Sequence, residues 1–167
     1  METSVVLSFT VKQMEGHEPD VLSLTPVLSG IPLAELVESF EREHCFEPTG
    51  GYRGLIPMWF GLTPPSPPPG YGSLEHYFIG RAGQGHRLEH SLLECQCGNV
   101  GCWPLYARIM VAERTVVWDS FRQLHRPLRE YSDFGPFSFD AEQYRKAVVE
   151  VAANNPELHF AWEDERD

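Results

Sequence analysis

Apolar and polar residues alternate along several stretches of this chain, and this pattern constrains the fold more than any other feature. In the first stretch, Val5, Leu7, Phe9 and Val11 occupy every second position. This is the period of a β-strand that buries one face and exposes the other. Residues 21–28 repeat the pattern after a polar, turn-forming insert, so we predict an N-terminal β-hairpin.

A second hairpin is predicted in the C-terminal half of the chain. Residues 107–111 and 115–121 alternate strongly and flank the polar triplet 112–114, as expected for two strands joined by a tight turn. The apolar face of such a hairpin belongs to the core. Its core candidates are Ile109, Val111, Val116 and Trp118.

Two segments have the period of an amphipathic α-helix. Residues 32–44 begin with Pro32, which suits a first helical turn. The apolar positions are Leu33, Leu36, Val37 and Phe40, and the acidic residues Glu35, Glu38, Glu41 and Glu43 fall mostly on the opposite face. At the second helix Asp140 is a suitable N-cap and Gln143 stands three residues later, in the capping-box position. Its apolar stripe is Tyr144, Ala147, Val148, Val151 and Ala152, and Asn154-Asn-Pro156 ends it.

These elements predict an α+β fold: a mostly antiparallel sheet of about five or six strands, two main helices packed on it, and a cysteine-bearing β-hairpin. We expect Leu36, Phe40, Val148 and Val151 to be buried against one sheet. The length of 167 residues and a hydrophobic share of 42% predict a single domain, 1–167. Residues 63–72 are expected to form an exposed proline-rich loop, and the acidic tail 163–167 is expected to fray.

Three of the four cysteines lie close together around a turn that contains two glycines. If Cys97 faces Cys102 across a hairpin, Cys95 faces Pro104 and Leu93 faces Tyr106, so the three thiols share one side. Three interpretations stay open: reduced cysteines packed in the core, a structural zinc site, and a disulfide between Cys97 and Cys102. For zinc, Cys95, Cys97 and Cys102 would be ligands, and the fourth ligand would be His44, Cys45 or His90.

The cysteine string extends into a longer pattern. It reads Cys95-Gln-Cys-Gly-x-x-Gly-Cys-Trp-Pro-Leu105 and is followed by Val117-Trp118 and by Phe137-x-Phe-Asp-x-x-Gln-Tyr144. In this C-terminal third to half the chain resembles a group of small uncharacterised bacterial proteins. The resemblance implies a bacterial, single-domain protein and transfers no catalytic residue.

The charge of the chain narrows the classes of partner. A formal net charge of -11 and a pI near 5.0 argue against nucleic-acid binding, which depends on Lys and Arg neutralising phosphates. No apolar run is long enough to span a membrane, and the N-terminus lacks the pattern of a signal peptide. We therefore expect a cytoplasmic protein with no nucleic-acid or membrane partner.

Catalytic motifs are absent from the sequence. We find no Gly-x-Ser-x-Gly, His-Glu-x-x-His, phosphate-loop or dinucleotide-binding pattern. Arg122, Arg126 and Arg129 form a basic cluster, interpreted as a solvated face balanced by Glu130 and Asp133. Charge and the lack of motifs favour a non-catalytic acidic binding protein, an immunity- or antitoxin-like inhibitor of a basic partner. The alternative is a metal-dependent or thiol enzyme that uses the cysteine hairpin.

Overall fold

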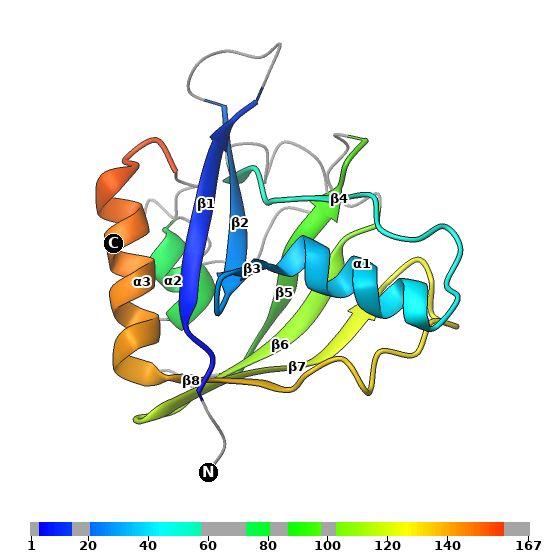
Figure 1. Ribbon diagram of the computed structural model, residues 1–167. Helices are drawn as coiled ribbons and strands as arrows, with labels where there is room; N and C mark the ends of the chain where they lie inside the picture. The colour runs from blue at the N-terminus through cyan, green and yellow to red at the C-terminus, as the bar shows by residue number, and fades with distance from the viewer. Residues whose placement is uncertain (1–3, 15–20, 58–72, 81–86, 98–102, 159–167) are drawn as a thin grey trace.

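The structure is a computed structural model of the chain. It describes residues 4–14, 21–57, 73–80, 87–97 and 103–158, without the side chains of residues 87, 88 and 90. Within these ranges the chain forms two antiparallel sheets and three helices, as Figure 1 shows. The predicted α+β class, mostly antiparallel strands with helices packed on them, is confirmed.

The N-terminal sheet contains the first predicted hairpin. Strand β1 (Leu7–Gln13) pairs with β2 (Leu22–Leu28) in antiparallel register, with Leu7 opposite Leu28. The two-residue strand β3 (Ile31–Pro32) adds to the other side of β2. Strand β1 is therefore at the edge of this sheet.

The second sheet has the order β4-β5-β6-β7-β8, and every neighbouring pair is antiparallel. Its strands are β4 (Tyr52–Arg53), β5 (Arg87–Cys95), β6 (Leu105–Val111), β7 (Thr115–Gln123) and β8 (Phe137–Asp140). Strands β6 and β7 form the second predicted hairpin. All four of its core candidates are buried.

Three helices complete the described structure, and two of them confirm the predicted helices. They are α1 (Leu33–Glu43), α2 (Leu74–Ile79) and α3 (Ala141–Asn154). Asp140 caps α3 as predicted, because its side chain accepts a hydrogen bond of 2.9 Å from the backbone N–H of Gln143. The third helix, α2, is capped by Ser73, whose Oγ accepts a hydrogen bond of 3.1 Å from the backbone N–H of His76.

The two sheets meet at two points and enclose one core. Leu24 and Leu55 exchange backbone hydrogen bonds of 2.7 and 2.9 Å, and Val5 forms a parallel bridge with Phe139 of β8. Helix α1 lies against β2 and β3, whereas α3 lies against β1, β7, β8 and α2. Both helices therefore contact the N-terminal sheet, α1 through β2 and β3 and α3 through β1, and α3 also packs on β7 and β8 of the second sheet. Val148 and Phe40 are buried as expected, but Leu36 and Val151 are only partly buried.

Two further predictions about chain organisation concern the proline-rich loop 63–72 and the acidic tail 163–167. Both segments lie outside the described residues. Within the residues that are described, no helix is long and apolar enough to cross a membrane.

Candidate functional site

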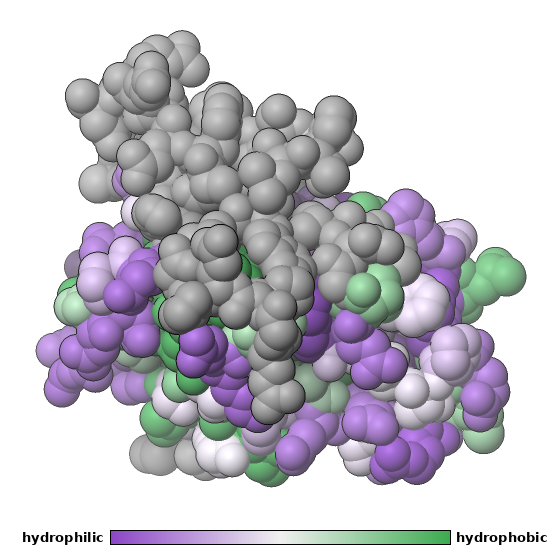
Figure 2. Space-filling view, turned by 90° about the horizontal axis from the view of Figure 1, so that it is seen from above, coloured by the Kyte–Doolittle hydropathy of each residue, from purple (hydrophilic) through white to green (hydrophobic). Residues whose placement is uncertain are grey.

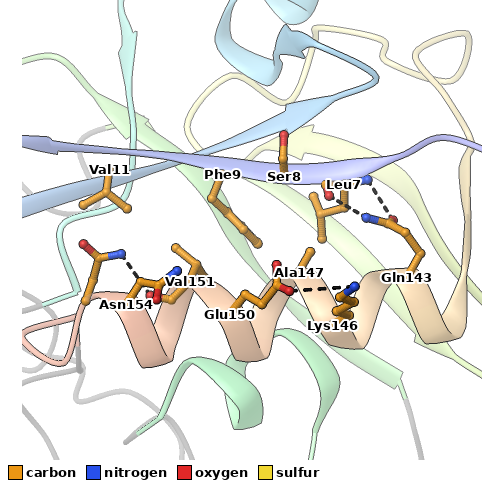
Figure 3. Close-up of a pocket in the computed structure, with 11 residues that line it drawn as sticks. Leu7, Ser8, Phe9, Val11, Gln143, Lys146, Ala147, Glu150, Val151 and Asn154 are labelled. Atoms are coloured by element: carbon orange, nitrogen blue, oxygen red, sulfur yellow. Dashed lines mark hydrogen bonds and ion pairs between the residues drawn. The ribbon is translucent and has the colours of Figure 1, made fainter.

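A groove of about 510 Å³ runs between the edge strand β1 and helix α3. Figure 3 shows Leu7, Phe9 and Val11 pointing from β1 toward the helix, while Ser8 points away. The facing wall is one stripe of α3, with residues at helical spacing: Gln143, Ala147, Glu150, Val151 and Asn154. The volume lies within the range of about 300 to 1,000 Å³ that is usual for binding sites.

One end of the groove is closed by Gln143. Its Oε1 accepts a hydrogen bond of 3.0 Å from the backbone N–H of Leu7, and its Nε2 donates one of 2.7 Å to the backbone oxygen of Leu7. Sequence reasoning placed Gln143 in a capping box, where its side chain would turn back to residue 140. Only the Asp140 half of that box forms, because the Gln143 amide bonds to β1 instead.

The middle of the groove is apolar, and its rim is charged. Phe9 packs edge to face on Phe78 of α2, with ring centroids 5.2 Å apart, and this contact holds the Phe9 ring in place. On the rim, the Nζ of Lys146 lies 3.9 Å from the Oε1 of Glu150. Both side chains are largely exposed, and such a pair contributes about 0 to 1 kcal/mol. Either charge is therefore available to a bound partner.

A second polar cluster surrounds Glu41, which is completely buried. Its Oε2 accepts hydrogen bonds from the hydroxyls of Tyr52 at 2.7 Å and Tyr131 at 2.6 Å, and from the Nη1 of Arg129 at 3.2 Å. Its Oε1 accepts the backbone N–H of Gly50 at 2.9 Å. Burial and the hydrogen bond to Glu41 raise the pKa of Tyr131 to about 12.

The Glu41 cluster corrects the predicted solvent-facing position of this residue. Glu41 lies four and eight residues after Val37 and Leu33, which are both fully buried, and these spacings share one helix face. That spacing was the signal in the sequence. Arg129 anchors the far side of the cluster, because its Nη2 also donates to the backbone oxygen of Pro48 at 2.6 Å. Both carboxylate oxygens of Glu41 thus accept hydrogen bonds from other parts of the protein. These bonds connect α1 to β4 and to the segment 129–131, so the cluster has a structural role.

The described residues include Cys95 and Cys97 but not Cys102, so the structure tests only part of the cysteine prediction. Cys95 is buried and opposite Tyr52 of β4, whereas Cys97 is exposed. The backbone N–H of Cys97 donates to the Sγ of Cys95 at 3.4 Å. Cys102 and the side chain of His90 lie outside the described residues, so the zinc, disulfide and packing interpretations remain predictions. Among the residues that are described, no three His, Cys, Asp or Glu side chains are arranged to hold a metal ion.

The predicted register of the cysteine hairpin was wrong where it can be checked. Leu93 lies opposite Leu105, and Tyr106 pairs with Ser91. A bulge between Ser91 and Leu93 shifts the ladder by one residue. Next to Cys95, Glu94 is buried and accepts a hydrogen bond of 3.0 Å from the Ser91 hydroxyl. Glu94 is also the ladder partner of Arg53, whose pKa is lowered by burial.

The predicted solvated face of arginines was also wrong in two of three positions. Arg129 is bonded to buried Glu41, and the guanidinium of Arg126 lies 3.8 Å from the ring centroid of Trp103. Arg122 does remain half-exposed, where it forms an ion pair of 2.6 Å with Glu89. All three positive charges therefore have partners within the protein.

Comparison with known proteins adds no assignment. No family model matches this sequence, and neither a curated protein nor a solved structure is detectably similar to it.

Proposed function

We propose that this is a non-catalytic binding protein whose acidic exterior associates with a basic partner protein. The observation that carries the proposal is the internal use of arginine. Arg129 has a side chain only 9% exposed and neutralises Glu41, Arg126 stacks on Trp103, and Arg108 forms two hydrogen bonds of 2.7 Å with Asp119. The charges of Arg129 and Arg126 therefore do not offset the acidic residues at the surface, and the charge of the partly exposed Arg108 offsets only Asp119.

Helix α1 illustrates the resulting surface. Glu35 in its first turn, Glu43 at its end and Glu47 beyond it are exposed. The one arginine of the helix, Arg42, is paired with Glu38 at 3.2 Å. On the face seen in Figure 2, most of the described residues at the surface are hydrophilic. With a net charge of -11, such a surface attracts a positively charged protein over a distance of several ångströms to about one Debye length.

The expected benefit is rapid association. Electrostatic steering raises association rates from about 10⁵–10⁶ to as much as about 10⁸–10⁹ M⁻¹s⁻¹ at low salt. Fast capture is what an immunity-type or antitoxin-like inhibitor needs, because it must reach a toxic basic enzyme before that enzyme reaches its target. The partner class that best fits this chemistry is a basic toxin or nuclease.

The test combines capture with kinetics. The immobilised protein is exposed to an extract of its source organism at low salt, bound proteins are eluted with a salt gradient, and association rates of the eluted partner are measured. We expect a basic partner whose association rate falls steeply with salt. The variant Glu35→Gln/Glu43→Gln/Glu47→Gln should associate several-fold more slowly at low salt, whereas the uncharged control Ser39→Gln should not. An association rate that is indifferent to salt and to the triple substitution would contradict the proposal.

A further inference from the structure

Backbone N–H and C=O groups line the outer edge of β1, and within the described residues only those at the start of this edge are hydrogen-bonded. Even-numbered residues of β1 bond to β2, as the flanking bonds from Ser29 N–H to Val6 and from Met14 N–H to Val21 show. In an antiparallel pair the intervening residues direct their N–H and C=O groups outward. The odd-numbered residues, Leu7, Phe9 and Val11 among them, therefore present these groups to the side of β8 and α3.

The chain just before β1 pairs with β8, but this pairing does not continue along the strand. At Val5 the backbone N–H donates to the backbone oxygen of Ser138 in β8 at 2.8 Å. At Leu7 the Gln143 carboxamide makes the two bonds that a neighbouring strand would make. Beyond Leu7, α3 takes the place of a strand, and the groove opens between the helix and the edge (Figure 3). No described residue hydrogen-bonds to the outward backbone groups of Phe9 or Val11.

We propose that an extended segment of the basic partner enters this groove and adds to β1 as a further strand. This proposal rests on the proposed function for the charge of the partner, and it adds the place and the mode of binding. Backbone groups of Phe9 and Val11 supply the hydrogen bonds, at the strand spacing of about 4.8 Å. Gln143 fixes the register of the added strand, because its carboxamide already bonds to the backbone groups of Leu7, and the next outward-facing groups belong to Phe9.

The side chains of the groove define the segment. Ala147 and Val151 of α3, opposite Phe9, form an apolar wall for every second side chain of the segment. Between them the rim carries Glu150, whose weak pair with Lys146 can yield to a basic side chain. An alternating apolar and basic segment is therefore the complementary sequence. A second copy of this chain is disfavoured on the same edge, because two molecules of net charge -11 repel each other.

The experiment uses a short synthetic peptide of alternating valine and arginine, and a copy methylated on its backbone nitrogens that keeps the same charges. Affinities are measured calorimetrically for the wild type, for Ala147→Phe, which fills the groove, and for Ala153→Phe, which makes the same change at an exposed position of α3. We expect at least tenfold weaker binding for Ala147→Phe and for the methylated peptide, and wild-type affinity for Ala153→Phe. The methylated peptide tests the wild type alone, so the result does not depend on how well the variant folds.

Three results would overturn the groove proposal. One is equal binding of both peptides, or equal binding by both variants, which would leave the acidic exterior as the binding determinant and the proposed function intact. Another is no binding of the unmethylated peptide to the wild type. The third is a dimer in light scattering that Ala147→Phe dissociates, since a second copy would then be the occupant of the edge.

Discussion

Replacing Glu41 with glutamine removes one negative charge from the buried cluster and leaves its shape unchanged. The carboxylate accepts four hydrogen bonds, from the Gly50 N–H, the hydroxyls of Tyr52 and Tyr131, and the Arg129 guanidinium. A carboxamide has one acceptor oxygen, and its NH₂ group faces donors that it cannot bond. Arg129 would also keep a buried charge without its counter-ion, since its side chain is only 9% exposed.

Breaking a buried ion pair by removing one partner costs about 3 to 5 kcal/mol. For a chain of this size we expect Glu41→Gln to lower the melting temperature by roughly 6 to 20 °C, at about 2 to 4 °C for each kcal/mol. The free energy of unfolding is measured by urea denaturation followed by tryptophan fluorescence. The matched control is Glu38→Gln on the same helix, whose exposed pair with Arg42 is worth less than about 1 kcal/mol.

The double variant Glu41→Leu/Arg129→Leu separates charge from packing. Because it removes both members of the pair, it should be more stable than Glu41→Gln if the unpaired guanidinium is the main cost. Our reasoning would be refuted if Glu41→Gln and Glu38→Gln had the same free energy of unfolding, because the buried cluster would then contribute nothing.

Three further predictions concern other parts of the fold. Gln143→Ala should lower the free energy of unfolding by about 1 to 2 kcal/mol, because Leu7 loses two hydrogen bonds, while the exposed control Arg145→Ala should stay within about 0.5 kcal/mol in urea denaturation. The pKa of Tyr131 rises from about 10 in the unfolded chain to about 12 in the fold, so its stabilising contribution is present below pH 10 and is lost as pH rises toward 12. Tyr131→Phe should flatten the dependence of stability on pH in that window, and an unchanged slope would contradict the assignment. In metal-free protein a thiol reagent should modify exposed Cys97 before buried Cys95, whereas stoichiometric zinc by elemental analysis, lost in Cys97→Ser, would establish the predicted metal site.

The local pattern of the sequence determined the secondary structure well. Alternation in β1, β6 and β7 and the helical stripes of α1 and α3 arise from burying one face of each element, and this requirement acts on neighbouring residues in the chain. The central strand β2 is buried on both faces, which fits its less regular pattern. The cap at Asp140 is equally local, because its partner is the backbone N–H three residues later. Such features can be predicted without knowing which elements meet.

The tertiary structure alone decided which polar groups became internal. Glu41 was assigned to the solvent because acidic side chains usually lie there, and it is buried because donors 9 to 90 residues away in sequence converge on it. Arg129 likewise left its predicted solvated face for a partner that only the fold brings near. The groove also has no local signal. It exists because α3 follows β8 at the point where β1 would otherwise gain a neighbouring strand, and this depends on how the two sheets meet at Val5 and Phe139.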